Sequence, residues 1–408
     1  MFNSIQFNSI QLRDKFFKNI FAVILFIFSF FITSCTLAEK SSIKFCLPLG
    51  FLKNEVNSSD DEKKECVLKI NIKDDNFTSL IEREWKLNFD LLVEDEIFYL
   101  EMIPVEKDLN INISIFVDKK IFYEASLENV KLIPGNNRLH FNLERVYEGF
   151  VKIKGAEING RETWSPASNI FTDGRKITIN PYYICEHEVT RKEFFDIIGQ
   201  DPSIADVEGE KDNTPVNYEN WYMAIAYCNK RSLTEGFTPC YSVSGIEDWE
   251  NLDFNTIPTT SDETWNAVTC DFNVNGYRLP TEIEWEWAAR GGKIEDGTAY
   301  VGSNNIGEVA WYGGNSSSKM HEIKLKKENA YGLYDMTGNA WEWCWDWYSE
   351  IIDLDTSIYG PETGKNRILR GGSWYNVIQY MGLEHRNGEK TPEAQYGSYG
   401  FRLVRSAL

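Results

Sequence analysis

The sequence predicts an α+β fold class, with a small antiparallel β-sandwich followed by a larger, loop-rich domain. Twelve of the thirteen tryptophans lie after residue 149, so the composition changes near that point. Before it, residues 66–145 alternate apolar and polar side chains in short runs, which is typical of half-buried strands. After it, Thr190 and Thr281 each precede a glutamate by three residues, which is a helix-start pattern.

The first 34 residues read as a bacterial lipoprotein signal peptide. Arg13, Lys15 and Lys18 precede an apolar run over residues 20–32, too short to span a bilayer comfortably. The following Ile-Thr-Ser-Cys35 is similar to a lipobox, in which Cys35 would carry two acyl chains after cleavage. A plain transmembrane anchor or a cleaved, secreted protein remains open. We expect a location in the bacterial cell envelope, at the outer surface or in the periplasm.

Two segments separate this leader from the larger domain. Residues 35–64 are polar and charged, which favours a solvated tether. Residues 65–148 contain period-two runs such as Leu68, Ile70 and Ile72, and later Ile111, Ile113 and Ile115. About six such strands with turns between them predict a small β-sandwich. No residue in it looks catalytic, so we expect it to act as a spacer.

The domain over residues 149–408 has a different pattern. Strands are expected over residues 150–154 and 177–180, and helices after Thr190, over residues 219–231 and after Thr281. Beyond residue 291 the helical periodicity fades, and Gly, Asn, Ser and Trp dominate. Tryptophan and tyrosine rings bury large areas, so they can supply a core without long regular elements.

Charge and residue usage exclude several function classes. A net charge of −20 gives no electrostatic footprint for nucleic acid. The four histidines show no metal-ligand spacing, and the chain contains no phosphate-binding loop or nucleophile elbow. Seven cysteines follow Cys35, an odd number, and Cys240 and Cys270 are the favoured bridge because they flank one insertion.

Several strings resemble the formylglycine-generating enzyme, or sulfatase-modifying factor, family. They are Glu188-Val-Thr, Gly276-Tyr-Arg-Leu-Pro-Thr-Glu-Ile-Glu-Trp, Gly332-Leu-Tyr-Asp-Met-Thr-Gly-Asn-Ala-Trp-Glu-Trp, Arg370-Gly-Gly-Ser-Trp and Gly400-Phe-Arg-Leu-Val. The resemblance covers residues 149–408 and implies an elaborated C-type-lectin-like fold. It also implies a calcium site in which Asp335 and Glu342 give side-chain oxygens and Gly338 and Ala340 give carbonyls. The alternative is a turn held by hydrogen bonds to Asp335, with Glu342 in a salt bridge.

The same resemblance argues against the family's oxidase activity. Two cysteines follow the Gly-Gly-Ser tripeptide in the oxidases, at offsets that fall here on Asn376 and Met381. Thiolates are the species that hold copper and engage a substrate cysteine, and neither residue replaces them. We therefore expect no copper and assign no catalytic residue.

The C-terminal tail also resembles the variable region of diversity-generating-retroelement proteins, in which fixed frame residues enclose variable ligand-binding positions. An ordinary family tail is the alternative. The positions between the two frames offer aromatic and small polar side chains, as adaptable binding surfaces do. The expected ligand-binding residues are Tyr375, Asn376, Val377, Tyr380, Leu383, His385 and Asn387.

The sequence thus favours a surface-anchored lipoprotein that binds an unknown protein or glycan through these loops. It contacts the membrane through its lipid anchor and takes no nucleic acid. The alternative is a divergent oxidoreductase, or a factor that modifies another protein.

Overall fold

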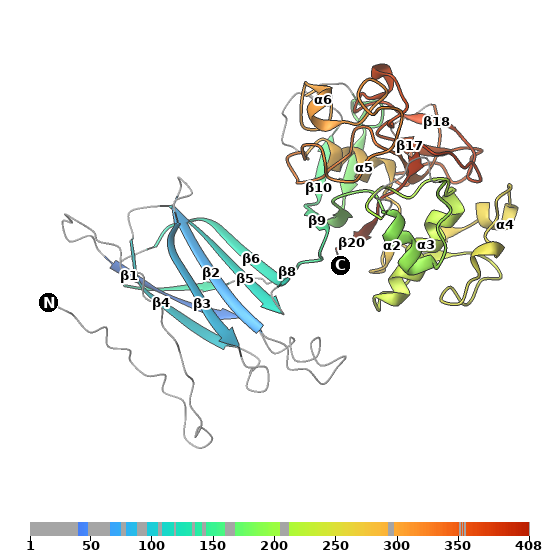
Figure 1. Cartoon of the computed structure of the whole chain (residues 1–408). Helices are drawn as coiled ribbons and strands as arrows, with labels where there is room; N and C mark the ends of the chain where they lie inside the picture. The colour runs from blue at the N-terminus through green and yellow to red at the C-terminus, as the bar shows by residue number, and fades with distance from the viewer. Residues whose placement is uncertain are drawn as a thin grey trace. The chain divides into compact units, whose positions relative to one another are not determined.

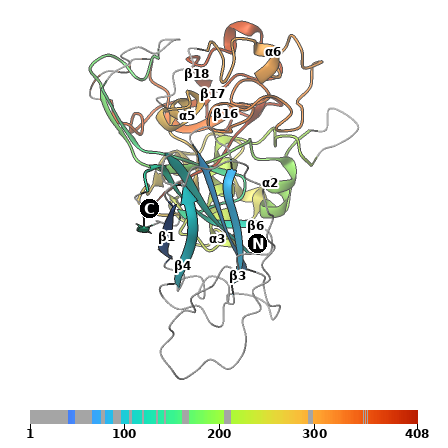
Figure 2. The same cartoon turned by 90° about the vertical axis from the view of Figure 1, so that its left-hand side faces the viewer.

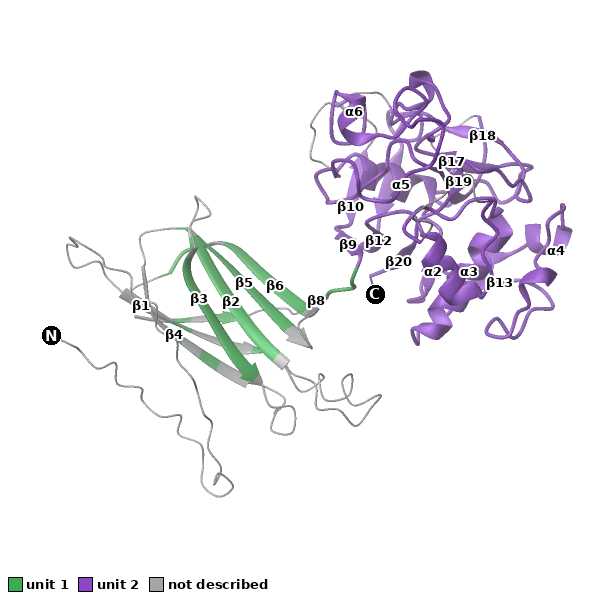
Figure 3. Ribbon diagram, viewed as in Figure 1, with its two compact units in different colours: residues 1–148 green, residues 149–408 purple. Residues whose placement is uncertain are grey.

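The structure is a computed structural model with two compact units, residues 1–148 and 149–408 (Figure 3). The description covers residues 40–47, 66–74, 79–87, 96–104, 108–117, 120–132, 135–140, 144–159, 168–204, 212–292, 298–350, 352, 354 and 356–407. Within these ranges, no helix has the length and apolar character needed to cross a membrane. Cys35 and the leader lie outside the described residues.

The first unit consists of two sheets, labelled in Figures 1 and 2. The larger has the order β3-β2-β5-β6-β8 and the smaller β4-β1-β7. Their bounds are β1 Lys40–Leu47, β2 Cys66–Asp74, β3 Ser79–Leu87, β4 Glu96–Pro104, β5 Leu109–Val117, β6 Lys120–Val130, β7 Gly135–His140 and β8 Glu144–Arg145. One core contains residues of both sheets, including Ile43 of β1 and Ile70 of β2.

Period-two alternation explains this core, since alternate residues of a strand share one face. Ile70 of β2 pairs with Ile113 of β5, and both are fully buried. The expected antiparallel sheet is confirmed, with the addition that β1 and β7 pair in parallel. The tether expected over residues 35–64 is wrong for residues 40–47, which form β1, with Ile43 and Leu47 in the core. Most of the strand expected around residues 87–91 lies outside the described residues.

The second unit begins with a sheet of order β15-β20-β12-β9. These strands are β9 Phe150–Ile153, β12 Tyr182–Cys185, β15 Tyr277–Arg278 and β20 Val404–Ser406. The expected helix starts are confirmed. Thr190 and Thr281 form capping boxes for α2 Arg191–Ile198 and α5 Glu282–Ala289, and Asn220 caps α3 Trp221–Thr234. Each cap satisfies amide groups that the first helical turn leaves unpaired.

A second sheet of order β18-β17-β16-β19 carries the C-terminal loops (Figure 1). Its strands are β16 Trp341–Trp347, β17 Arg367–Arg370, β18 Asn387–Lys390 and β19 Tyr399–Gly400. Short elements complete the unit: β10 Ala156–Asn159 with β11 Lys176–Ile179, β13 Tyr241–Ser242 with β14 Thr269–Cys270, α4 Glu263–Asn266, α6 Ile306–Val309, and the 3-10 turns η2 Phe254–Thr256 and η3 Ile378–Tyr380.

Aromatic side chains replace long regular elements in the core of this unit. Trp221, Trp285 and Trp343 are fully buried, and Trp221 donates its indole N–H to the Cys344 carbonyl at 2.9 Å. Trp221 also packs against Trp345 with ring centroids 5.6 Å apart. Such large rings can cover a core that short strands and loops leave open. The mixed, loop-rich α+β architecture is therefore confirmed.

Candidate ligand-binding surface

Strand β17 leads into the first candidate loop, and its last residue is a buried arginine. Arg370 is fully buried and donates to Glu282 at 2.7 Å and to Glu286 at 2.8 Å, both on α5. It also donates to the Leu383 carbonyl at 2.8 Å. Because one guanidinium connects a helix, a strand and a loop, it fixes where the loop leaves the sheet.

Arg386 extends this network to the end of the same loop. Its Nε and Nη2 donate to the two Glu282 oxygens at 2.7 and 2.8 Å, and its Nη1 donates to the Ser349 carbonyl. Glu282 therefore receives two arginines, and their charges lower its pKa despite burial. The loop over residues 371–386 is held at both ends by this one carboxylate.

A second buried pair anchors the chain after β19. Arg402 donates from Nε to Glu342 Oε2 and from Nη2 to Glu342 Oε1, both at 2.6 Å. Trp285 also donates its indole N–H to Oε2, at 2.7 Å. Neither charged residue is exposed, so each depends on the other for its charge to be tolerated. The frame residue Arg402 is thereby tied to β16.

The turn after Arg370 requires glycine. Gly371 and Gly372 have φ angles of 93° and 80°, in the left-handed region that side chains disfavour. A Cβ on Gly372 would come within 2.1 Å of Met381 Cε. Trp374 follows, with its backbone N–H bonded to the Asn339 carbonyl and its indole N–H to the Gly397 carbonyl, both at 2.9 Å. It is half-buried and links two loops.

Exposed apolar side chains recur along these loops. Eleven large apolar side chains are exposed in the described part of the chain, and five of them lie within residues 375–396. We call these five the apolar face: Tyr375, Val377, Ile378, Tyr380 and Tyr396. Tyr375 is the most exposed, at 72%, although its ring contacts Trp374 edge-on. Clustered exposed apolar groups typically mark interaction sites.

The expected ligand-binding residues divide into three groups in the structure. Tyr375, Val377 and Tyr380 are exposed, whereas Asn376, His385 and Asn387 are only half-exposed. Leu383 is buried and packs in the main core of the unit, so its inclusion in a binding surface was wrong. Its carbonyl accepts from Arg370, which draws this part of the loop inward.

Sequence reasoning missed two members of the face. Ile378, which was not among the expected residues, begins the turn η3 and is 43% exposed. Tyr396 lies within the expected binding loops but was not named among their ligand-binding residues, and it is 48% exposed next to Gly397, whose carbonyl accepts from Trp374. Only this contact between loops could reveal its position.

Asn376 and Met381, the positions at which the sequence comparison expected the cysteines of the oxidases, have structural contacts here. Ser373 Oγ donates to Asn376 Oδ1 at 2.6 Å, and the Asn376 carbonyl accepts from the Gly313 amide. Met381 is buried against Ile306 and Ala310. Asn376 therefore belongs to a hydrogen-bonded turn, and Met381 fills an apolar cluster.

The expected calcium residues lie around the Arg402–Glu342 pair and fit in part. Asp335 Oδ2 accepts from the Lys324 amide, but its buried Oδ1 has no hydrogen-bond partner. Burial raises the Asp335 pKa to about 6. Glu342 fits less well, because both of its oxygens already accept hydrogen bonds from Arg402. Gly338, with φ of 83°, provides a turn whose carbonyls could converge on an ion.

Glu188, which was not among the expected ligands, is a further buried carboxylate close to Asp335 and Glu342. Both of its carboxylate oxygens are buried without a hydrogen-bond partner. Its pKa is raised well above normal by burial and then by Asp335 and Glu342. Three carboxylates thus surround one guanidinium, an excess of negative charge that a divalent cation would offset. In the described residues, no three acidic, histidine or cysteine side chains converge as a complete ligand set.

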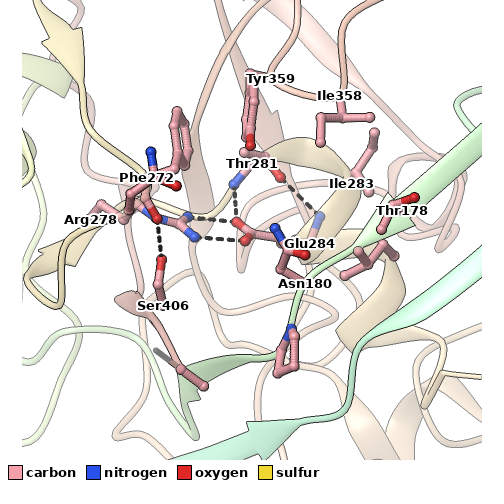
Figure 4. A pocket seen from close by; sticks show the side chains of 14 residues that line it. Thr178, Asn180, Phe272, Arg278, Thr281, Ile283, Glu284, Ile358, Tyr359 and Ser406 are labelled. Atoms are coloured by element: carbon pink, nitrogen blue, oxygen red, sulfur yellow. Dashed lines mark hydrogen bonds and ion pairs between the residues drawn. The ribbon is translucent and has the colours of Figure 1, made fainter.

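A separate pocket of about 220 Å³ lies elsewhere in the unit (Figure 4). Its lining includes Thr178, Phe272, Thr281 and Ile358. The charges that line it, Arg278 and Glu284, already pair at 2.6 and 2.7 Å (Figure 4). Because Glu284 also closes the Thr281 capping box, this pocket offers a ligand few unused polar groups.

Comparison with known proteins identifies the family. The model of the sulfatase-modifying factor enzyme 1-like domain matches residues 141–407. The chain belongs to the sulfatase-modifying factor family. Chaperone protein LppX of Paenibacillus barcinonensis is 36% identical over 256 residues, or 57% of this chain and 82% of that protein. The formylglycine-generating enzyme of Streptomyces coelicolor is 33% identical over 163 residues, or 35% of this chain and 51% of that enzyme.

Solved structures agree with this assignment. Treponema denticola variable protein 1 superposes with a TM-score of 0.57 at 37% identity, covering 63% of this chain and 94% of that one. The expected formylglycine-generating-enzyme-like, C-type-lectin-like fold is confirmed. The sulfatase-modifying factor domain of this chain therefore uses a known fold to present the apolar face.

Removing Arg402 should strongly destabilise the protein. Arg402→Met leaves Glu342 charged and buried, so we expect a loss of about 3–5 kcal/mol in the free energy of unfolding, measured in urea. The double variant Arg402→Met/Glu342→Met should cost clearly less than the two single losses added together. Lys192→Met, which breaks an exposed pair of 2.8 Å, is the matched control and should hardly shift the midpoint. A double variant that lost as much unfolding free energy as the two single variants together would contradict the coupling of Arg402 and Glu342.

The free energy of unfolding should also decrease as the pH rises, because of Asp346. Burial and the charge of Glu282 raise the Asp346 pKa to about 7. A carboxyl whose pKa is higher in the folded state stabilises that state when protonated, so this contribution is lost as pH rises from about 4 to 7. Asp346→Asn keeps an acceptor for the Glu282 amide. The variant should be more stable than wild type at pH 8 by roughly 1–3 kcal/mol, and equal to it near pH 4. If the difference in unfolding free energy between Asp346→Asn and wild type were the same at pH 4 and pH 8, this role of Asp346 would be contradicted.

Proposed function

We propose that this protein is a non-enzymatic binding protein that holds a partner protein on its apolar face. The observation that carries this proposal is the clustering of Tyr375, Val377, Ile378, Tyr380 and Tyr396 on loops whose ends are fixed by buried ion pairs. Exposed aromatic and aliphatic side chains on a rigid support lose little entropy on binding.

The support under the face does not depend on the side chains of the face. The loop over residues 371–386 is held by Arg370 and Arg386 on Glu282, and the loop over residues 391–398 by backbone hydrogen bonds. Residues such as Val377, which is 57% exposed, can therefore vary without loss of the fold. This agrees with a variable region enclosed by fixed frames.

A protein partner is favoured over a glycan. Sugar rings are recognised by flat aromatic faces together with several polar groups, as small-molecule sites generally combine apolar and polar contacts. Here the aliphatic side chains of Val377 and Ile378 stand between Tyr375 and Tyr380 in the sequence. Mixed aromatic and aliphatic patches are typical of interfaces with apolar protein segments.

Two relatives point in the same direction. The 37% identity to Treponema denticola variable protein 1 supports a variable binding face. The 36% identity to a protein named as a chaperone supports binding of apolar segments of other proteins. Asn376 and Met381 at the positions of the oxidase cysteines argue against formylglycine formation, and hence against a need for copper.

We extend the proposal to one calcium ion near β16. Asp335 would give its unpartnered Oδ1, Gly338 and Ala340 their carbonyls, and Glu342 a share of its carboxylate. Calcium prefers such hard oxygen ligands. The ion would offset the excess negative charge of Glu188 and Asp335 beside the Arg402–Glu342 pair.

The proposal also places the protein in the bacterial cell envelope, attached through lipid on Cys35. The basic residues, apolar run and lipobox-like string before Cys35 support this attachment. Two acyl chains give a stable anchor, whereas one chain gives marginal binding.

The apolar face should be required for binding unfolded protein. We expect the wild type to suppress the aggregation of heat-unfolded citrate synthase, measured by light scattering. Replacing Tyr375, Val377, Ile378 and Tyr380 with Ser should remove this effect. Because exposed substitutions usually cost under about 0.5 kcal/mol each, this variant should keep its melting temperature within a few degrees.

The matched control replaces three exposed apolar residues elsewhere, Phe195, Ile204 and Leu325, with Ser. It should suppress aggregation as the wild type does. If both variants lost the suppression of aggregation to the same extent, nonspecific apolar contacts and not this face would bind the unfolded citrate synthase. A wild type that leaves aggregation unchanged would contradict the proposed class of partner.

Removal of calcium should lower the thermal stability. A ligand that binds only the folded state stabilises it by mass action. We expect EDTA to lower the melting temperature of the wild type, and added calcium to restore it. Asp335→Ala should melt at the same temperature with EDTA or calcium. If EDTA left the melting temperature of the wild type unchanged, the alternative would be favoured, a turn held only by hydrogen bonds.

Lipid attachment should depend on Cys35. Cells grown with labelled palmitate should label the wild type and leave Cys35→Ala unlabelled, because the thiol is the site of the thioether. Labelling of both proteins to the same extent would rule out this anchor.

A further inference from the structure

Two cysteines meet at the base of an insertion that the proposed binding function does not use. Strands β13 and β14 pair with Tyr241 opposite Cys270, and the Asp271 amide donates to the Cys240 carbonyl at 2.8 Å. Cys240 immediately precedes β13, and Cys270 ends β14. The pairing therefore brings together two thiols that are thirty positions apart in the sequence.

The two thiols lie within hydrogen-bonding reach of each other. The Cys270 thiol hydrogen-bonds to the Cys240 sulfur, and this bond lowers the Cys240 pKa. The positive charges of Arg278 and Arg405 act in the same direction. Burial raises the Cys270 pKa. In this pair, therefore, the proton leaves Cys240 first and the Cys240 sulfur becomes the better nucleophile.

The two thiols differ in their exposure to solvent. Cys240 is 2% exposed, whereas Cys270 is partly exposed and is therefore the more accessible of the two thiols. Phe272, two residues after Cys270, lines the pocket of Figure 4 together with Arg278. In the same unit, Cys185, Cys228 and Cys344 are buried.

We propose that Cys240 and Cys270 form a reversible disulfide by thiol exchange with a small-molecule disulfide such as oxidised glutathione. Cys270, the more exposed thiol, gives its proton to the Cys240 thiolate as its sulfur attacks the external disulfide. This forms a mixed disulfide and releases one glutathione thiolate, which takes the proton on from Cys240. The Cys240 thiolate then attacks the Cys270 sulfur of the mixed disulfide, and the second glutathione leaves. Two protein thiols and one external disulfide thus become one protein disulfide and two thiols.

The cross-link would fasten the insertion to the core. Residues 241–269 carry Trp249 and Trp265, which pack against each other with centroids 5.9 Å apart, and Trp265 also packs against Tyr222 of α3. These contacts hold the insertion from one side. A disulfide at its base would close the chain into a ring and restrict the unfolded state.

Mass spectrometry of the full chain can test the bond. No lysine or arginine lies between Arg231 and Arg278, so trypsin leaves both cysteines in one peptide. After treatment with oxidised glutathione, this peptide should lose about 2 Da, the mass of two hydrogens. A glutamyl endopeptidase cuts between the cysteines, and its two fragments should stay joined until a reductant is added. The oxidised protein should melt roughly 5 °C above the reduced one.

Three variants separate the alternatives. Cys240→Ser should accumulate a glutathione adduct on Cys270, because the thiol that resolves it is gone. Cys270→Ser should take up little glutathione, because Cys240 is buried. Cys228→Ser is the control and should still form the disulfide, although Cys228 is near enough to Cys240 to influence its charge. A Cys228–Cys240 link, or thiols that stay reduced in folded wild type, would overturn the proposal.

Discussion

Buried arginine–glutamate pairing is the interaction on which the C-terminal half depends. Arg370 and Arg402 are fully buried, and each bonds to carboxylates at 2.8 Å or less. A guanidinium offers several donors in a fixed plane, so one side chain can join three segments. The cost of burying these charges is high, and it makes each pairing specific, because a displaced partner would leave an uncompensated charge.

Aromatic packing supplies what regular elements do not. Arg367 illustrates this, since its guanidinium lies 3.4 Å from the ring centroid of Trp347 and 3.7 Å from that of Trp221. Burial lowers its pKa well below the usual value, and no carboxylate hydrogen-bonds to it in the described residues. Stacking on π-faces helps to offset the loss of water. Rings and guanidinium groups together form a rigid base beneath irregular loops.

This base supports loops whose outer side chains do not contribute to the core. The loops over residues 371–398 begin and end at anchored residues, so their outer side chains can change without disturbing the core. Tyr375 and Val377 are exposed there, whereas Met381 is buried against Ile306 and Ala310. The fold thus restrains the ends of the loops, and the residues between them set the chemistry.

The sequence by itself determined the helix caps at Thr190 and Thr281, the alternating strands of the first unit and the family, because these depend on local patterns. Only the tertiary structure decided which loop residues face solvent. Leu383 is buried, and its carbonyl accepts from Arg370, whereas Tyr396 is exposed next to Gly397, whose carbonyl accepts from Trp374. Local periodicity carries no information about such contacts, since they join residues far apart in the chain through buried charge and ring packing.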